Sequence, residues 1–441
     1  MIENRRDFIK KTALGTAGLG LSTISAKSYS NILGANDRLN YGIVGIHSRG
    51  KANMKAALAV PNTSIAAICD VDSRVLVDVQ GRLKEMGKKK AKEYVDYREM
   101  LENKDIDVIT IATPEHWHAP MAIMGAQAGK HVYVEKPCSH NPWETVALME
   151  VEKKTGKKIQ MGNQQRSAPT SIKAIKEIRE GIIGDVYFGK AWYSNKRGPI
   201  GYGKRVPVPE WLNWDLWQGP APRRDYQDIW VHYNWHWFWD YGTGEVHNNG
   251  THEIDICRWA LGVDYPERVS SEGGRFHYDD DWEFYDTQLV NYRFPENKMI
   301  TWEGKSCNPF PHHGWGRGSS LHGTKGTILL DRNNYIVYDM DGNVVKHEKE
   351  EEESATTNTV GAGALDTYHM NNLANAIRNG EKQHSPISDA GISTQLCHYG
   401  NIAQATGDTL HIDTESGKIV GNGKAMQYWK RVYEPGWEPI V

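Results

Sequence analysis

A glycine-rich turn followed by an aspartate twenty residues later gives this sequence its clearest chemistry, the binding of a dinucleotide. Residues 45–50 read GIHSRG, which matches the GxGxxG fingerprint except that His47 replaces the middle glycine. The first glycine makes a tight turn, the second admits the pyrophosphate, and the third lets a helix pack against the strand. With His47 present, the pyrophosphate must sit farther out or the imidazole must lie over it as a donor. The expected cofactor contacts in this turn are Gly45, His47, Ser48, Arg49 and Gly50.

Asp70 ends the next apolar run, where a carboxylate can accept hydrogen bonds from the ribose hydroxyls. Its negative charge would repel a 2'-phosphate, so NAD is favoured over NADP, although the nearby Arg74 weakens this preference. Asp70 could instead cap the following helix, but Asp72 or Ser73 would serve that purpose equally well.

These residues need a parallel sheet to position them, and short apolar runs alternate with helical stretches from residue 39 onward. This alternation of strands and helices predicts a Rossmann domain over residues 38–162. Ligands of such folds bind at the carboxyl edge of the sheet. His116 and Trp117, which follow one strand, and Arg166, which follows the last, are therefore candidate substrate contacts; His118 is a candidate cofactor neighbour or only a packing residue at a helix start. The expected strands are residues 40–44, 64–69, 106–112, 131–135 and 159–162.

Length and composition restrict the class of protein. The 441 residues are enough for two or three domains, and a formal charge of -3 gives no basic surface for nucleic acid. The five cysteines show no CxxC spacing, so we expect neither a disulfide framework nor a cysteine zinc site, and most should be buried.

The N-terminus resembles an export signal. Residues 4–10 read NRRDFIK, and an apolar stretch of small residues follows at 12–24. This layout predicts a twin-arginine signal peptide over residues 1–30, and hence a periplasmic or otherwise exported protein that leaves the cytoplasm folded. The apolar stretch is shorter than a membrane span requires, so we expect no membrane anchor. An ordinary amphipathic helix with a chance arginine pair is the alternative.

Several segments in a fixed order resemble one enzyme family. They are HVYVEKP at residues 131–137, GNQQRSAP at 162–169, GTHEIDICRWALG at 250–262 and GTKG at 323–326. Together they resemble the Gfo/Idh/MocA oxidoreductases, which include glucose-fructose oxidoreductase and inositol dehydrogenase. The resemblance implies an α/β protein whose second, α+β domain, here residues 163–441, contains a large and mostly antiparallel sheet. That domain would bind a carbohydrate or polyol and form a homodimer or homotetramer.

The resemblance also implies roles for individual residues. Lys136 matches the lysine of the EKP motif and would steady a developing oxyanion, whereas His252 matches the histidine of a D-x-G-x-H segment and would be the general base. Asn248 replaces the aspartate of that segment, and an amide cannot accept the proton. His252 could act alone, Asn248 could only position substrate, or the chain could perform related chemistry. Further cofactor contacts implied are Thr113, Pro114, His118, Glu135, Lys136 and Gln164.

Two other features bear on the site. Glu245, His247 and His252 are metal-ligand types, but their spacing does not match HExxH, so polar residues in a substrate cleft explain them more simply and no metal is expected. A tryptophan-rich segment could stack against sugar rings or could fill a core. Within it, Trp235, Trp237 and Trp239 would share one face of a strand. The full set is Trp211, Trp214, Trp217, Trp230, Trp235, Trp237 and Trp239.

Three functions remain open from the sequence. The first is an NAD(P)-dependent oxidoreductase that acts on a sugar hydroxyl and holds its cofactor tightly, because free NAD should be scarce outside the cytoplasm. The second is a glycosidase or lyase that oxidises a ring hydroxyl transiently, as the resemblance to the NAD-dependent α-N-acetylgalactosaminidase branch allows. The third, suggested by His47 and Asn248, is a carbohydrate-binding protein without catalysis.

Overall fold

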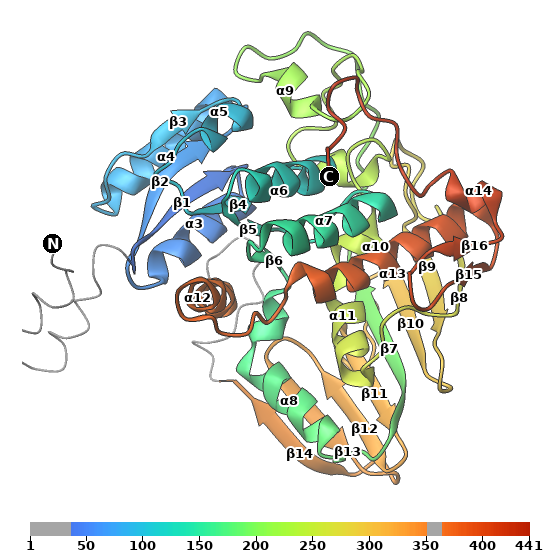
Figure 1. Cartoon of the computed structure of the whole chain (residues 1–441). Coiled ribbons are helices and arrows are strands. Elements are labelled where there is room, and N and C mark those ends of the chain that lie inside the picture. The colour runs from blue at the N-terminus through green and yellow to red at the C-terminus, as the bar shows by residue number, and fades with distance from the viewer. Residues whose placement is uncertain (1–36, 351–363) are drawn as a thin grey trace, which may run out of the picture. The chain divides into compact units, whose positions relative to one another are not determined.

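A six-stranded parallel sheet forms the first part of the fold in the computed structural model, which describes residues 37–350 and 364–441. The strand order is β3-β2-β1-β4-β5-β6 (Figure 1). The five predicted strands are confirmed to within about two residues, and the missed strand β3 is only three residues long. The expected export segment lies outside the described residues. The strands are β1 (Leu39–Val44), β2 (Thr63–Cys69), β3 (Lys92–Tyr94), β4 (Val108–Ile111), β5 (His131–Val134) and β6 (Ile159–Met161).

Helices connect these strands, and local sequence signals explain where they begin and end. The Asp72 side chain caps the helix after β2 by accepting a hydrogen bond from the backbone N–H of Arg74. Asn141 caps the helix after β5, Pro142 opens it, and Gly156 ends it in the left-handed conformation. The helices are α3 (Arg49–Ala59), α4 (Ser73–Glu85), α5 (Tyr97–Leu101), α6 (His118–Gln127) and α7 (Pro142–Thr155), with 3-10 turns at Glu115–Trp117 and Gln164–Ser167.

A ten-stranded sheet dominates the second part and confirms the expected large, mostly antiparallel architecture. Its order is β14-β13-β12-β11-β7-β10-β9-β8-β15-β16, and only the β7–β10 pair is parallel among its described pairings. The strands are β7 (Val186–Ser194), β8 (Arg268–Gly274), β9 (Thr287–Arg293), β10 (Met299–Lys305), β11 (Arg317–Gly323), β12 (Gly326–Leu330), β13 (Asn334–Tyr338), β14 (Val344–Lys349), β15 (Leu410–Ile412) and β16 (Ile419–Val420).

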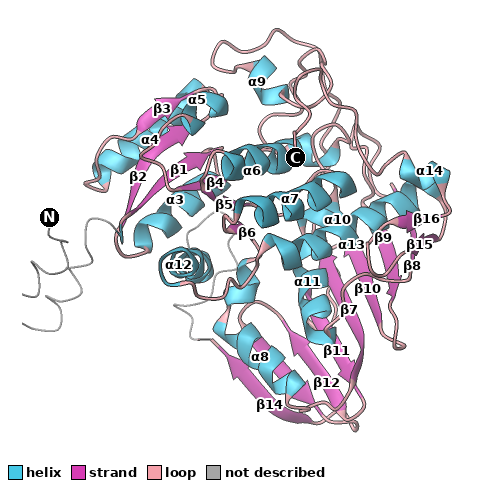
Figure 2. Cartoon of the chain, viewed as in Figure 1, coloured by secondary structure: helices cyan, strands magenta, loops and turns pink. Residues whose placement is uncertain are grey.

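Helices α8, α11 and α13 lie against one face of this large sheet (Figure 2). Cys257 of α11 and Leu396 of α13 are fully buried in one apolar cluster with Trp302 of β10. Helix α12 instead packs its Leu373 into the cluster of the parallel sheet, beside α3. The remaining helices are α8 (Pro169–Arg179), α9 (Trp214–Gln218), α10 (Glu245–Asn248), α11 (Gly250–Leu261), α12 (Ala364–Asn379), α13 (Ile387–Thr406) and α14 (Gly423–Met426).

The tryptophan-rich segment differs from the expectation. Asn234–Trp237 is a 3-10 turn and not a strand, so Trp235, Trp237 and Trp239 do not share the face of a strand. Most of the seven tryptophans belong to an apolar cluster of their own, in which Trp214 stacks on Trp217 and Trp230. The segment therefore supplies mainly core.

All five cysteines are buried and unpaired, as expected for most of them. Within residues 37–350 and 364–441, no helix combines the length and apolarity needed to cross a membrane.

Candidate dinucleotide and saccharide site

A cavity of about 760 Å³ lies at the carboxyl edge of the parallel sheet and extends to residues of the large sheet. Because it joins both parts of the fold, it can hold two molecules next to each other. Most of the residues expected from the sequence line it: Gly45, His47, Ser48, Arg49, Asp70, Thr113, Pro114, Trp117, His118, Glu135, Lys136, Gln164, Trp235, Asn248 and His252.

The glycine-rich turn has the shape that a dinucleotide requires. Gly45 has a φ of 72°, and a Cβ there would lie 2.7 Å from the backbone of Ala112 and Thr113. A Cβ at Gly50 would lie 2.0 Å from the Gly45 carbonyl oxygen. Gly50 is buried behind the turn and does not line the cavity, so its role is close packing of α3 and not direct cofactor contact. The turn and the N-terminus of α3 therefore fit a pyrophosphate.

His47 does not disrupt this turn. Its imidazole stacks on that of His232, with ring centroids 4.2 Å apart and planes 9° from parallel. His232 Nε2 lies 3.0 Å from the Asp72 carboxylate. Burial lowers the pKa of both imidazoles, so the two rings can stack without charge repulsion at neutral pH. A segment distant in sequence thus lies against the pyrophosphate turn.

Asp70 lies at the end of β2 and lines the same cavity. Its carboxylate accepts hydrogen bonds from the backbone N–H of Ile46 at 2.7 Å and of Asp72 at 3.0 Å. The helix cap is Asp72, so the capping alternative for Asp70 is wrong. Burial raises the pKa of Asp70 to about 6. Arg74 bonds to Asp72 at 2.7 Å and stacks on Trp211, so its charge is already engaged.

Lys136 is one of the cations that line the cavity. Its Nζ donates hydrogen bonds to the Asn248 backbone carbonyl at 2.6 Å and to the Asn248 side-chain oxygen at 3.2 Å. Burial lowers the pKa of Lys136, and Glu115, Glu135 and Glu245 oppose this effect. A lysine with a lowered pKa is neutral more often near pH 7, and a neutral amine can accept a proton.

His252 is placed less favourably for the role of base. Burial lowers its pKa well below the usual value, and the positive charges of Arg332 and Lys136 add to this effect. Its Nδ1 has no hydrogen-bond partner among the described residues. A base whose pKa lies far below the working pH gives little driving force for proton transfer. Both side chains line the cavity and burial lowers the pKa of each, so the roles that the sequence suggested for Lys136 and His252 stay predictions.

Three expected substrate contacts do not reach this cavity. His116 is fully buried, and its ring nitrogens lie within hydrogen-bond distance of the Tyr241 and Trp217 carbonyl oxygens. Trp237 is buried and stacks on Trp282 at 4.0 Å. Both side chains make their contacts in the protein interior, so the expectation that they contact substrate is wrong.

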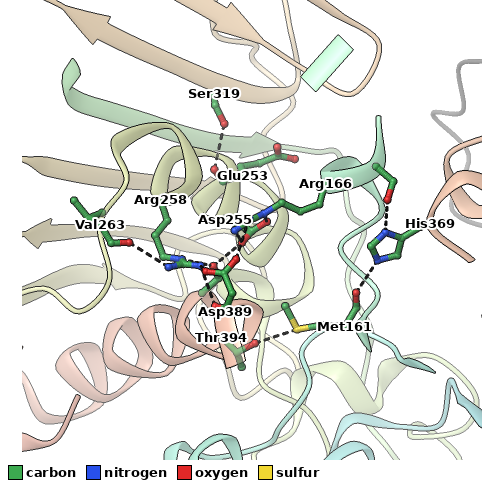
Figure 3. A network of polar contacts seen from close by, with 12 residues as sticks. Met161, Arg166, Glu253, Asp255, Arg258, Val263, Ser319, His369, Asp389 and Thr394 are labelled. Carbon is green, nitrogen blue, oxygen red and sulfur yellow. Dashed lines mark hydrogen bonds and ion pairs between the residues drawn. The ribbon is translucent and has the colours of Figure 1, made fainter. Parts of the chain in front are cut away.

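Arg166 is the third expected contact that the structure corrects. Its guanidinium pairs with Asp255 at 2.7 Å inside a polar network that also holds Arg258 and Asp389 (Figure 3). Arg166 borders a second, separate pocket. Its charge is neutralised in the protein interior, so Arg166 links helices and does not bind substrate in the dinucleotide cavity.

His118 lines the cavity as a supporting residue. Its Nδ1 lies 2.6 Å from the Pro137 carbonyl oxygen and its Nε2 lies 2.9 Å from that of Thr113. Both nitrogens are therefore occupied by backbone, and the ring fixes the turn after β4 against the turn that carries Lys136.

Comparison with known proteins identifies the family. Residues 39–163 match the profile described as "Oxidoreductase family, NAD-binding Rossmann fold", and residues 187–310 match its companion, "Oxidoreductase family, C-terminal alpha/beta domain". Both profiles belong to one family and together cover more than half of the chain. This chain belongs to the Gfo/Idh/MocA oxidoreductase family. The predicted family and fold class are thereby confirmed.

Relatives by sequence carry a glycosidase name. A "Glycosyl hydrolase family 109 protein" from Saccharopolyspora erythraea is 28% identical over 254 residues, 51% of this chain and 55% of the relative. One from Shewanella pealeana is 29% identical over 208 residues, 43% of this chain and 46% of the relative. The chain thus spans about half the length of these relatives.

Solved structures agree on the Gfo/Idh/MocA fold. Levoglucosan dehydrogenase in complex with NADH and levoglucosan superimposes with a TM-score of 0.66 at 20% identity, covering 86% of this chain and 100% of the dehydrogenase. An aldose-aldose oxidoreductase from Caulobacter crescentus, complexed with glycerol, has a TM-score of 0.63 at 18% identity, covering 85% and 100%.

Several cavity residues of this Gfo/Idh/MocA protein were not singled out from the sequence. Glu115 directly follows Thr113-Pro114, and burial raises its pKa to about 7 while nearby Lys136 opposes the rise. Its carboxylate accepts a hydrogen bond from the Thr243 hydroxyl. Only its position beside the expected cofactor turn could have indicated it. The others come from the second part of the fold: Tyr193, Arg197, Arg317 and Arg332.

The metal alternative gains no support from these surroundings. Glu245 pairs with Arg197 at 2.8 Å, and His247 packs against His398 with ring centroids 4.3 Å apart. In the part of the chain that the structure describes, no group of three or more His, Cys, Asp or Glu side chains is arranged to hold a metal ion.

Proposed function

We propose that this protein binds NAD in the cavity and oxidises a hydroxyl group of a carbohydrate or polyol that lies between the nicotinamide and the large sheet. The observation that carries the proposal is the buried amine of Lys136 in a cavity wall formed by a dinucleotide turn on one side and by polar residues of the large sheet on the other. Bound NAD would supply the hydride acceptor.

Side chains of the cavity would transfer the proton and bind the saccharide. Lys136, held by Asn248, takes the hydroxyl proton when its amine is neutral, and Glu115 tunes how often it is neutral. His252, neutral and with a free Nδ1, donates or accepts a hydrogen bond from the saccharide. Trp217 and Trp235 also line the cavity, and an indole is suited to contact with the apolar face of a sugar ring.

A second outcome of the same oxidation is favoured by the relatives named glycosyl hydrolase family 109 proteins. A ketone on the sugar ring acidifies the neighbouring C–H, so that a base in the cavity can remove that proton and a glycosidic group can leave. Water would then add to the double bond left by the elimination, and the hydride taken up by the cofactor in the first step would return to the ketone. This would restore the hydroxyl, so the net reaction would be hydrolysis of the glycoside without net redox change. Asn248 places an amide, and not a carboxylate, beside Lys136. This arrangement is compatible with net oxidation and with glycoside cleavage.

We also propose NAD over NADP, export, and self-association. Asp70 in the ribose position disfavours a 2'-phosphate, and Arg74 is already bound to Asp72, which supports NAD. The twin-arginine pattern at residues 4–10 supports export of the folded protein with its cofactor. Leu289, half exposed on the large sheet, suits a contact between copies in a homodimer or homotetramer.

The test begins with the cofactor. Protein purified without added nucleotide is denatured, and the released molecules are identified by mass spectrometry. Stoichiometric NAD or NADH supports tight retention. Assays with free sugars and with p-nitrophenyl glycosides then separate net oxidation, which yields an oxidised sugar, from cleavage, which releases nitrophenol. Protein that is empty, fails to bind added NAD and turns over no saccharide would overturn the proposal and leave the non-catalytic alternative.

A further inference from the structure

Arg332 differs from every other cation in the cavity wall. It lies in the turn between β12 and β13, at the end of the cavity formed by the large sheet. Among the described residues it makes no hydrogen bond or ion pair, and its Nε is buried without a partner. Arg332 as a whole is half-buried and lines the cavity, so its charge is partly shielded from water and is available to a ligand.

The acidic side chains near Arg332 are already used by other cations. Glu253 pairs with Arg317 through a 2.7 Å contact, and Asp366 pairs with Arg49. Arg332 therefore lies near two further guanidinium groups, those of Arg317 and Arg49, which already hold these carboxylates. Burial lowers the pKa of Arg332 to about 9, and the charge of Arg317 contributes. A guanidinium stays protonated in proteins, so this corner of the cavity carries positive charge that residues 37–350 and 364–441 do not neutralise.

His252 lines the same cavity, and one of its ring nitrogens also lacks a hydrogen-bond partner among the described residues. Its side chain is 7% exposed, its Nδ1 has no partner, and Arg332 is the charge that acts on it most strongly. A neutral imidazole and a free guanidinium next to each other form a cradle for an oxygen-rich anion, because one supplies a neutral hydrogen bond and the other a forked, charged one.

We propose that Arg332 binds an anionic substituent of the saccharide, so that the substrate is an acidic sugar carrying a carboxylate or a sulfate ester. This inference rests on the proposed function for the choice of a saccharide. The anion neutralises the charge of Arg332 and anchors the ring, while Lys136, which lines the same cavity, serves the reacting hydroxyl. Neutral sugars leave the guanidinium unpaired and therefore bind more weakly.

Isothermal titration of the full chain, saturated with NAD, tests the proposal. The probes are D-glucuronate, D-galacturonate and D-galactose 6-sulfate, with D-glucose and D-galactose as neutral counterparts. We expect at least one acidic sugar to bind about 10- to 100-fold more tightly than its neutral counterpart, the gain typical of a charge-assisted hydrogen bond. Preference for the uronates assigns a carboxylate, and preference for the sulfated sugar assigns a sulfate ester.

Substitutions of Arg332 test whether this residue causes the preference for acidic sugars. Arg332→Gln should reduce acidic-sugar affinity to the neutral level without changing neutral-sugar affinity, and Arg332→Lys, which keeps the charge, should retain part of the preference. Arg205→Gln is the matched control, because Arg205 is exposed and pairs with Asp225 outside the cavity. Retained preference in Arg332→Gln would overturn the proposal, as would loss of NAD binding in place of sugar binding.

The binding readout separates this inference from the proposed function. Arg332-dependent binding of acidic sugars without turnover of any saccharide would support the inference and overturn the enzymatic role. Equal affinity for acidic and neutral sugars, or no binding of any acidic sugar to the wild-type protein, would overturn the inference even if a neutral sugar is oxidised.

Discussion

Lys136 Nζ donates to two oxygens of one residue, the Asn248 backbone carbonyl at 2.6 Å and its side-chain oxygen at 3.2 Å. The amine is thus held by neutral acceptors, which steady its position without adding the Coulombic stabilisation that a carboxylate would give its protonated form. This relationship explains how the amide at residue 248 can serve a proton-accepting lysine.

The variant Asn248→Asp tests this relationship. A carboxylate next to Lys136 favours the ammonium form, so the pKa of Lys136 rises and a higher pH is needed to free the amine. We expect the acidic limb of kcat/KM to move upward by about one pH unit or more. Asn248→Ala serves as the control and should lower kcat without the same upward shift. An unchanged acidic limb in Asn248→Asp would exclude Lys136 as the titrating base.

Replacing Glu115 should move the same limb in the opposite direction. The carboxylate of Glu115 raises the pKa of Lys136 against the lowering effect of burial. In Glu115→Gln the pKa of Lys136 falls further, so the neutral amine is available at lower pH. The glutamine oxygen can still accept the hydrogen bond from Thr243, so folding should be preserved. A pH profile that keeps its acidic limb, with kcat alone reduced, would indicate that Glu115 is only structural.

Lys136→Met removes the proposed proton acceptor and preserves much of the side-chain volume. Loss of a positioned acid or base costs about 10²- to 10⁴-fold in rate. We expect kcat to fall by that amount while NAD remains bound, because the dinucleotide turn at Gly45 is independent of Lys136. Turnover by rapid mixing and NAD content by mass spectrometry are measured on the same preparation. Activity within threefold of wild type would refute the assignment.

Much of this site could be predicted because its signals are local. The turn at residues 45–50 and the lysine after β5 are marked by short motifs, and apolar runs mark the strands that carry them. Arg317 and Arg332 could not be found in this way, because the pairing of β11 with β7 and β12 brings them to the cavity. Their surrounding sequence resembles that of any charged strand end.

The errors have a similar origin. His116 and Trp117 are adjacent in sequence, yet His116 bonds to backbone carbonyls of the tryptophan-rich segment while Trp117 borders the cavity. Periodicity could not separate them, because the polar partners come from about 100 residues away. Trp237 is buried and not in the cavity because a 3-10 turn, and not a strand, decides which ring of this segment faces inward.

The stacked imidazoles of His47 and His232 predict a role in cofactor retention. His232 belongs to the second part of the fold, lines the cavity and is bound to Asp72 of the first part. His232→Ala should therefore increase the rate of NAD release by about tenfold, equivalent to the loss of a modest contact of about 1.4 kcal/mol. His411→Ala, an exposed histidine outside the cavity, is the control. Release is followed with an enzymatic trap for free NAD, and equal rates in all three proteins would contradict the role.

Arg166→Leu separates structural from binding arginines. The Arg166 guanidinium is almost fully buried against Asp255, so the substitution leaves a carboxylate in the interior without its main partner. Breaking a buried pair in this way costs about 3–5 kcal/mol. Urea denaturation should show that loss, whereas Arg205→Gln at the surface should change the free energy of unfolding by less than about 0.5 kcal/mol. The folded fraction of Arg166→Leu should bind saccharide with wild-type affinity, because Arg166 borders a different pocket. Unchanged stability combined with weaker saccharide binding would contradict the structural role and indicate that Arg166 contacts the substrate.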